Sequence, residues 1–406
     1  MKRIVFCWEL GGNYGHITGF ARLGQMFRTR GYEVIVVLRN LQYANLLGAG
    51  IVCVQAPIPR AVPARGQSYS YTGILAQISY LDPVVFTDYV DAWRQLLAEY
   101  KADLVIADHA PTPMLAARAQ RIPVAVIGTG FVIPPFAQQF PWFYPDMQEP
   151  EGDLDQKVLH TINHAMAVLG GAPLQNLGDI FTEADTFLCT LPELDHYGFR
   201  ADTDYWGPLF SDDLGQEPIW PEAIGLNNLG GNETTPKIFA YLTSKLTHLQ
   251  QAVAALAQMP GAKLVHIPGL SPEQKEAWST PELKIEAHPV NMRRVLALAD
   301  MVVSQGGMGV TALCALGAMR HVIIPTQMEQ TMLARRLSEM GLAYVIGAKA
   351  SQAEYVELFQ RALNCPQLHK SSQLLAQKYQ GFDQQEQLEV LVDEILALLT
   401  EESPCS

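Results

Sequence analysis

The chain has 406 residues, 49% of them hydrophobic, with 28 Lys and Arg against 41 Asp and Glu. This length predicts two domains rather than one core, and the formal net charge of −13 disfavours duplex nucleic acid and anionic membranes as main partners. The six cysteines are scattered and lack CxxC spacing, which is typical of reduced residues in a cytoplasmic protein. Composition leaves the oligomeric state open.

The first residues do not have the pattern of a targeting segment. Met1–Leu10 begins with basic residues, but Glu9 interrupts its apolar run and no small-residue cleavage site follows, so we expect a strand rather than a signal peptide. No uncharged apolar stretch of about 18 residues occurs in the chain, so we expect no membrane span.

The first half alternates apolar runs with helical patterns. The expected strands are 4–8, 33–38, 51–54, 104–107, 124–127 and 186–188, and the expected helices are 17–30, 84–100, 114–120 and 160–169. This alternation predicts a Rossmann-like, mostly parallel sheet with helices on both faces. The glycines of the first loop are spaced GGxxG rather than GxGxxG, and no acidic residue ends the second strand, so a nicotinamide dinucleotide is not favoured.

Polar residues follow two of these strands. His16 comes after the first glycine loop, and Asp108 and His109 come directly after the strand at 104–107. Because the carboxyl ends of parallel strands meet at one edge of a sheet, Asp108 and the first loop are expected at the same edge. Histidine is suited to take a proton from a hydroxyl at neutral pH, and a carboxylate can hold its second ring nitrogen. The alternative is that His16 only caps the helix, whereas alternation points His109 away.

The segment 128–147 is rich in aromatic residues and proline. Its aromatic residues are Phe131, Phe136, Phe140, Trp142, Phe143 and Tyr144. Such a segment either packs on the domain or forms the wall of an apolar ligand pocket. The sequence leaves both interpretations open.

Residues 207–236 begin with Gly207 and carry four prolines and four further glycines. This composition predicts an interdomain linker. A second α/β series follows. Its expected strands are 237–241, 262–266, 283–286, 301–303 and 322–324, and its expected helices are 246–258, 292–299, 310–316, 351–363, 367–379 and 384–400.

Gly306, Gly307 and Gly309 lie between the strand at 301–303 and the helix at 310–316. Glycines allow a bound group to approach the backbone, and the first N–H groups and the dipole of a helix favour an anion. A phosphate or diphosphate is therefore expected here. The alternative is a tight turn that needs glycine only for its backbone angles.

The stretch SQGGMGVTALCALGAMRHVIIPTQMEQTMLARRL, from Ser304, resembles the donor-binding signature of GT-B glycosyltransferases of the UDP-glycosyltransferase and macrolide-glycosyltransferase type. In that family a His-Gly-Gly loop holds the diphosphate, and an Asp-Gln or Glu-Gln pair holds the sugar hydroxyls. Glu329 and Gln330 match that pair. The resemblance is dense from Glu286 to Met340 and recognisable from Ile4 to Leu38.

The resemblance implies an α/β fold of two Rossmann-like domains that face each other across a cleft, with a C-terminal helix that crosses back. Residues 1–206 would form the acceptor-binding domain, 207–236 the linker, 237–370 the nucleotide-sugar domain, and 371–406 helices that pack back on the first domain.

The resemblance also implies site residues. His16, in Tyr14-Gly15-His16-Ile17, matches the catalytic histidine, with Asp108 as its partner. The donor site would comprise Thr243, Ser244, His288, Val290, Gln305, Gly306, Gly307, Met308, Gly309, Thr311, Thr326, Glu329 and Gln330. The acceptor site would comprise Gly12, Asn13, Phe131, Phe136 and Trp142.

Several positions depart from the family pattern. The segment Thr243-Ser244 lacks the glycine of the family's Gly-Ser or Gly-Thr pair near the phosphates. Gln305 stands where the family usually has histidine. Ala287 and Val290 replace the tryptophan and glutamine of the segment that packs on the nucleobase, so the nucleobase stays open.

The function implied is an inverting transfer of a sugar from a UDP- or dTDP-sugar to a small, apolar or aromatic acceptor. No His/Asp/Glu cluster with metal-ligand spacing stands out, so we expect neither a metal ion nor a further cofactor. A GT-B sugar-nucleotide epimerase and a non-catalytic sugar-nucleotide-binding homologue remain alternatives. The sequence does not identify the acceptor, the acceptor atom that receives the sugar (O, N, S or C) or the donor sugar.

Overall fold

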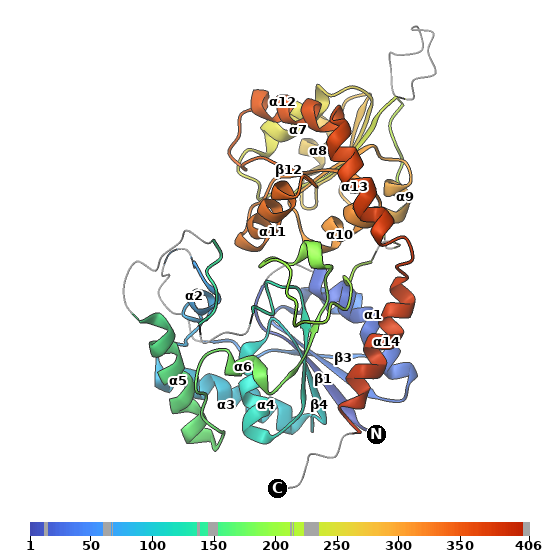
Figure 1. Cartoon of the computed structure of the whole chain (residues 1–406). Coiled ribbons are helices and arrows are strands. Elements are labelled where there is room, and N and C mark those ends of the chain that lie inside the picture. Colours follow the sequence, from blue (N-terminus) through green and yellow to red (C-terminus); the bar gives the residue numbers. More distant parts are fainter. Residues whose placement is uncertain are drawn as a thin grey trace. The chain divides into compact units, whose positions relative to one another are not determined.

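The computed structural model describes residues 1–11, 15–59, 66, 68–135, 139–144, 153–211, 213, 215–222 and 235–400. The chain forms two compact units (Figure 1). Unit 1 comprises Met1–Leu209 and Asp383–Ser406, and unit 2 comprises Phe210–Phe382.

Unit 1 is built on a six-stranded parallel sheet in the order β3-β2-β1-β4-β5-β6. The strands are β1 Arg3–Trp8, β2 Glu33–Leu38, β3 Val52–Gln55, β4 Leu104–Asp108, β5 Val124–Gly128 and β6 Asp185–Leu188. The helices are α1 Gly15–Thr29, η1 Leu41–Leu47, α2 Tyr71–Leu75, α3 Pro83–Glu99, α4 Pro111–Gln120, α5 Leu154–Leu169, α6 Asp179–Thr182, η2 Pro192–Leu194 and α14 Gln384–Ala397. The predicted Rossmann-like sheet is confirmed.

Alternate residues of these strands face two separate cores, as the period of two in a strand requires. Val5 and Cys7 of β1 pack with α3, α4 and α5, whereas Ile4 and Phe6 pack with α1 and α14. In Figure 1, α3, α4 and α5 accordingly lie on one side of the sheet and α1 and α14 on the other. Helices cover both faces, so both sides of the strands are apolar.

Helix α14 completes the second of these cores from the far end of the chain. Leu388, Leu391, Val392 and Ile395 are all buried there against α1 and the sheet. The predicted return of the C-terminal helix to the first domain is thus confirmed.

Unit 2 contains a second six-stranded parallel sheet, in the order β12-β11-β10-β7-β8-β9. Its strands are β7 Lys237–Tyr241, β8 Ala262–His266, β9 Leu283–Glu286, β10 Met301–Ser304, β11 Arg320–Ile323 and β12 Tyr344–Val345. Its helices are α7 Leu249–Ala257, α8 Pro272–Trp278, α9 Met292–Leu296, α10 Met308–Leu316, α11 Met328–Glu339, α12 Gln352–Leu363 and α13 Pro366–Lys378.

The chain returns to unit 1 later than the predicted boundary at residue 371. Helix α13 belongs to unit 2, because Leu368 is buried in the core that contains β10 and β11, and Ser372 and Leu375 lie against Thr311 of α10. The return begins at Asp383.

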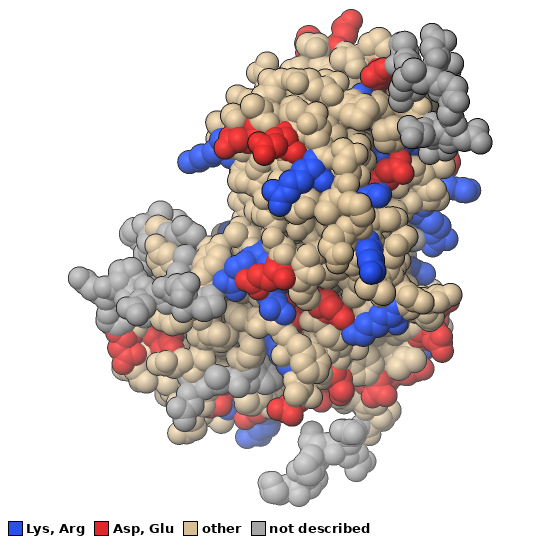
Figure 2. Space-filling model, turned by 45° about the horizontal axis from the view of Figure 1, so that its top comes forward, with Lys and Arg blue, Asp and Glu red and all other residues tan. Residues whose placement is uncertain are grey.

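Two surface properties bear on possible partners. Among the described residues, no helix is long and apolar enough to cross a membrane. On the face drawn in Figure 2, Lys and Arg side chains are interspersed with Asp and Glu, and the described residues form no continuous basic area there.

Candidate functional site

The carboxyl ends of β1 and β4 lie side by side, because these strands pair in parallel with Trp8 opposite Asp108. His16 stands in the first turn of α1, after the loop that follows β1. Its Nδ1 lies 2.7 Å from Asp108 Oδ2, which is the distance of a strong hydrogen bond. The structure therefore brings together the two residues that were expected to form a dyad.

This contact determines which nitrogen of His16 is available as a base. With Nδ1–H donating to the carboxylate, Nε2 carries the lone pair. The indole of Trp8 stacks on the imidazole, with ring centroids 5.5 Å apart. Gly11 has a left-handed φ of 99°, and a Cβ at this position would lie 3.8 Å from Nε2. A side chain at this position would therefore contact the basic nitrogen.

The loop between β10 and α10 of unit 2 is held by buried hydrogen bonds. Gly306 has a φ of 84°, and a Cβ there would lie 2.7 Å from Ile323, so only glycine fits without a shift. The Gly306 N–H donates to Ser304 Oγ at 3.0 Å, and this hydroxyl lies 2.8 Å from His321 Nε2. Burial lowers the pKa of His321 to about 3, so its ring is neutral at physiological pH.

Helix α10 begins directly after this loop. Gly307 is its N-cap, and the Thr311 N–H donates to Gly307 O at 3.0 Å. The N–H groups of Met308, Gly309 and Val310 precede that first helical hydrogen bond. No atom of the described residues lies within 4 Å of a Cβ placed on Gly307, so these residues leave the backbone open there. This helix start has the properties of an anion-binding site.

Gln305 links two strand ends. Its Nε2 donates to the backbone oxygen of Tyr241 at 2.9 Å, and Tyr241 ends the neighbouring strand β7. One amide hydrogen of Gln305 is therefore used to hold the loop. The second is not involved in that bond.

No protein-family model and no curated protein matches the sequence. Solved structures do match. The structure is similar to the glycosyltransferase VinC in complex with dTDP, at 15% identity and a TM-score of 0.67 over 98% of this chain and 100% of that one. It is also similar to CalG4, the calicheamicin glycosyltransferase, at 18% identity and a TM-score of 0.70 over 99% of each chain.

A third similar structure is the spinosyn rhamnosyltransferase SpnG complexed with spinosyn aglycone, at 15% identity and a TM-score of 0.63 over 99% of this chain and 100% of that one. These likenesses cover nearly the whole chain, and its two parallel six-stranded sheets agree with them. The chain has the GT-B fold. The fold predicted from the sequence is confirmed.

In the first GT-B domain, the predicted acceptor residues lie in different surroundings. Gly12, Asn13 and Phe136 lie outside the described residues. Phe131 is buried, with its ring 5.4 Å from Phe143. Trp142 is half-buried and its backbone pairs with Ser70.

The rest of the aromatic segment is mostly packed inside the domain. Phe140 and Phe143 are buried, and Phe140 lies 5.1 Å from the ring of Tyr71. Segment 128–147 was expected either to pack on the domain or to form the wall of a ligand pocket. Phe140 and Phe143 pack on the domain.

The ring of His109 packs against aromatic residues, although its backbone is not the extended one that the expected alternation requires. Its backbone is left-handed, with a φ of 46°, and its ring lies 5.9 Å from both Tyr71 and Phe131. Burial, together with the nearby His16, lowers its pKa to about 4, so the ring is neutral at physiological pH.

In the second GT-B domain, three predicted donor contacts need correction. The Thr311 side chain is buried and faces Cys314 and His321, because the fourth residue of this helix falls on its inner face. Val290 is buried in the core with Phe239 and cannot pack on a nucleobase. These two side chains have structural roles.

Gln330 is the third correction. It is buried, and its Oε1 accepts from both the N–H and the hydroxyl of Thr326, at 2.9 and 3.0 Å. That oxygen therefore organises the start of α11 instead of facing a sugar hydroxyl. Thr326 itself is exposed, and Glu329 is half-buried in the first turn of α11.

The other predicted donor residues lie near the same sheet edge. Thr243 and Ser244 follow β7, and Ser244 is exposed. His288 follows β9 and is exposed. Within the described ranges, no group of three His, Cys, Asp or Glu side chains could hold a metal ion.

Sequence reasoning did not single out Glu9 as a site residue. Its carboxylate is buried after β1 and accepts from the Tyr89 hydroxyl at 3.0 Å, the Thr112 N–H at 2.9 Å and the Thr112 hydroxyl at 2.6 Å. Burial raises its pKa to about 7. The sequence pattern that could have identified Glu9 is a carboxylate directly after an apolar strand.

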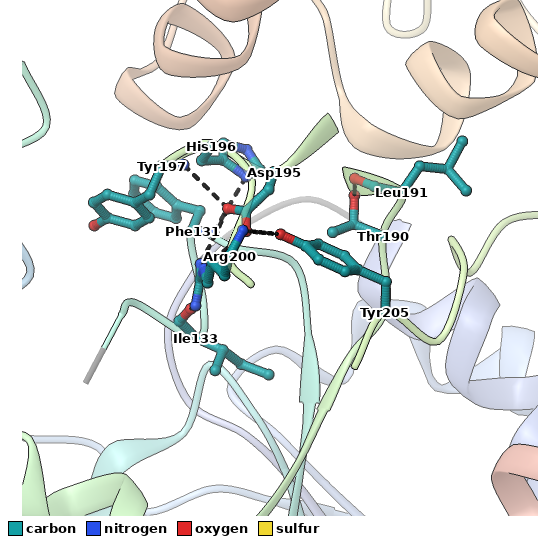
Figure 3. Close-up of polar contacts among 9 residues, drawn as sticks. All are labelled: Phe131, Ile133, Thr190, Leu191, Asp195, His196, Tyr197, Arg200 and Tyr205. Atoms are coloured by element: carbon teal, nitrogen blue, oxygen red, sulfur yellow. Dashed lines mark hydrogen bonds and ion pairs between the residues drawn. The ribbon is translucent and has the colours of Figure 1, made fainter. Parts of the chain in front are cut away.

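The buried polar group around Asp195 was also missed (Figure 3). Asp195 is fully buried after β6 and forms an ion pair with Arg200. Its remaining partners, the Tyr197 N–H and the Tyr205 hydroxyl, follow within ten residues, but this irregular segment has no periodic pattern that indicated them.

Proposed function

We propose that this protein transfers a sugar from a UDP- or dTDP-sugar to a hydroxyl group of a small, apolar or aromatic acceptor. The observation that carries the proposal is the 2.7 Å contact between His16 and Asp108 at a strand edge of a GT-B chain. Similarity to VinC in complex with dTDP and to SpnG complexed with spinosyn aglycone supports the two kinds of ligand.

The proposed transfer inverts the sugar at its anomeric carbon. His16 Nε2 takes the proton as the acceptor O–H bond breaks, and the oxygen forms a bond to the anomeric carbon. The bond from that carbon to the diphosphate oxygen breaks, and its electron pair leaves with the nucleotide. Asp108 stabilises the imidazolium that results, because its carboxylate already holds Nδ1.

The diphosphate is proposed to lie at the start of α10. The backbone at Gly307 is open, and the N–H groups of Met308 and Gly309 and the helix dipole favour its charge. The same N–H groups and helix dipole stabilise the negative charge that develops on the diphosphate as it leaves.

An assay with UDP- and dTDP-sugars tests the proposal and its two alternatives. The substrates are incubated with and without a panel of phenols and aliphatic alcohols, and all sugar products are identified. We expect a new glycoside of inverted configuration only with an acceptor. A free or nucleotide-linked epimer without an acceptor would indicate an epimerase, and binding without turnover would indicate a non-catalytic protein.

Transfer is expected to need no divalent ion, because backbone N–H groups and a helix dipole stabilise the diphosphate. The rate measured in EDTA should equal the rate in its absence. Activity lost in EDTA and restored by magnesium or manganese would contradict this prediction.

A further inference from the structure

Trp8 ends β1 at the position that pairs with Asp108 of β4. Its side chain is buried in the core that also contains α1 and α14. The indole lies against the imidazole of His16, with ring centroids 5.5 Å apart and ring planes inclined by 24°. This separation is within the range of an offset stack. The last residues of two paired strands thus supply His16 with an aromatic face and a carboxylate.

The indole nitrogen does not explain why a tryptophan is buried at this position. Trp8 Nε1 is buried, yet no atom of the described residues accepts a hydrogen bond from it. An unpaired buried donor destabilises a fold, and leucine or phenylalanine would fill an apolar space without one. What tryptophan adds here is the π face that it presents to His16.

Asp108 is in contact with His16, at 2.7 Å from Nδ1, whereas the titratable groups next to this dyad are neutral at physiological pH. Burial, together with His16, lowers the pKa of His109 to about 4. Burial raises the pKa of Cys189 to about 12 and holds that of Tyr71 well above its usual range. The charge that forms on His16 is therefore balanced mainly by Asp108.

The carboxylate of Glu9 lies on the other side of the sheet. Glu9 follows Trp8, and its side chain is bonded to α3 and α4, which cover the face opposite to α1. The contact on the ring of His16 from β1 is therefore aromatic, and the charged residue that follows is directed away from it.

A stacked indole acts differently on the two protonation states of an imidazole. The π face attracts a cation that lies within about 6 Å of the ring centroid, and tryptophan has the strongest such face. His16 lies at 5.5 Å and becomes a cation when it takes the acceptor proton. Trp8 thus stabilises the imidazolium more than the neutral ring, which favours proton transfer.

We propose that Trp8 is a positioning residue for His16, whose indole face orients the imidazole and stabilises its protonated form. This inference rests on the proposed function. Asp108 acts at Nδ1, in the plane of the imidazole, and Trp8 acts on its face, so the two contributions are separate. Removal of the indole should therefore make His16 a weaker base even where Asp108 no longer contributes.

Two substitutions of Trp8 separate its π face from its N–H group and its bulk. Trp8→Phe keeps an aromatic face and removes the N–H, whereas Trp8→Leu removes both. Trp8→Met is flexible enough to fill the space, and it replaces the leucine variant if that variant does not fold. Phe27→Leu is the matched control, because Phe27 is buried in the same core but lies roughly 16 Å further along α1 than His16.

The pKa of His16 is measured by NMR on full-length protein labelled at the histidine ring carbons, with the signal assigned by its loss in His16→Ala. This measurement needs no substrate. The pH dependence of kcat/KM is measured with the accepted nucleotide sugar and alcohol, because its low-pH limb reports the same base. Calorimetry with dTDP reports on the donor site, and thermal unfolding shows which variants are folded.

We expect Trp8→Leu to lower the pKa of His16 by roughly 0.5–1.5 units and to move the low-pH limb of kcat/KM equally. Trp8→Phe should lower this pKa by less than half as much, because a weaker π face remains. Phe27→Leu should leave it unchanged, and all variants should bind dTDP normally. Water that entered a space left by leucine would solvate the imidazolium and raise the pKa, so the sign of the shift distinguishes a lost π face from lost packing.

Displacement of His16 from Asp108 is a second way in which a substitution could lower the pKa. A double-mutant cycle with Asp108→Asn separates this cause from the loss of the π face. We expect the shift caused by Trp8→Leu to persist in the Asp108→Asn protein, because the indole acts on the imidazole directly.

The inference is overturned by an unchanged or raised pKa in Trp8→Leu, by equal shifts in the phenylalanine and leucine variants, or by a shift that disappears in the Asp108→Asn protein. Failure of the proposed function gives a different result. In that case no nucleotide sugar is consumed with any alcohol, while the NMR titration of His16 still distinguishes Trp8→Leu from Trp8→Phe.

Discussion

His16 and Asp108 are 92 residues apart in the chain and meet at 2.7 Å. Their contact follows from a simple rule: side chains placed after adjacent parallel strands share one edge of the sheet. The shared sheet edge could be predicted from the sequence, because Asp108 ends β4 and His16 follows the loop after β1. The pairing of the two side chains was expected from the family resemblance. The sequence was not sufficient for the contact of His196 with Phe131, which depends on the path of two irregular loops.

His16→Ala should reduce kcat by about 10²–10⁴-fold, the usual cost of removing a general base. The affinity for dTDP should not change, because the diphosphate is proposed to bind in unit 2. Steady-state kinetics and calorimetric titration measure the two quantities. His160→Ala, at an exposed position of α5, is the matched control and should keep full activity. Near-normal turnover of His16→Ala would refute the assignment of the base.

Gln305→His should make donor affinity depend on pH. Glutamine offers a neutral donor at every pH, and one of its hydrogens holds the Tyr241 oxygen. A histidine here would gain charge below its ordinary pKa of about 6.5, and charged hydrogen bonds to a diphosphate are stronger by about 1 kcal/mol. We expect dTDP to bind this variant several-fold more tightly at low pH than at neutral pH.

Calorimetry with dTDP at several pH values measures this effect. Gln258→His, at an exposed position after α7, is the control for general effects of an added histidine. Identical pH profiles for Gln305→His and the original protein would mean that position 305 does not contact the diphosphate.

At the scale of elements, most segments with regular periodicity were predicted from the sequence, including α9 within the longer expected helix 292–299, but the twelve-residue helix α11 was not predicted. The strands of both sheets are apolar runs because both of their faces are buried. Helices α2, α6 and α8 have only four to seven residues each, too few to show a helical period, so they were missed. The inner face of α10, which buries Thr311, was missed because nearly all its residues are apolar or small.

Glu9 joins two elements, β1 and the start of α4, and should make stability depend on pH. The carboxyl group ionises near pH 4.5 in the unfolded chain and near pH 7 in the folded one. The folded state therefore binds more protons between these values, so its stability is fully present below pH 4.5 and declines as the pH rises toward 7.

Glu9→Gln should remove this decline. Denaturant unfolding of unit 1 at pH 5 and pH 7.5 should show a smaller loss of stability in the variant, by on the order of 2 kcal/mol. Glu99→Gln, at the exposed end of α3, is the matched control. If both variants follow the pH dependence of the original protein, Glu9 does not titrate in this range.

At the scale of the whole molecule, the sequence predicted two α/β domains and a helix that returns to the first. The sequence did not show at which residue the chain returns to the first domain. The pattern of α13 is amphipathic, like that of α14, and periodicity alone does not show which core an apolar face meets. Only the packing of Leu368 and Leu375 assigns α13 to unit 2.

Leu391→Ala should destabilise unit 1 by about 2–5 kcal/mol, because Leu391 is fully buried between α14, α1 and the sheet. Thermal unfolding followed by calorimetry should show an earlier transition for unit 1. The affinity of the folded protein for dTDP should stay the same, since unit 2 has a core of its own. Val390→Ala, whose side chain is 48% exposed on the same helix, should change little.

The split of unit 1 into two stretches of sequence has a consequence for its synthesis. A ribosome that has completed the first stretch, Met1–Leu209, must still make all of Phe210–Phe382 before α14 emerges. At about 5–20 residues per second this takes roughly ten to thirty seconds, during which the apolar side of the first sheet that α14 will cover has no partner from its own chain. Unit 2 is continuous and needs no later segment, so it can complete its fold as soon as Phe382 has emerged, whereas unit 1 must wait for α14. Nascent chains are therefore expected to depend on chaperones until the last helix docks.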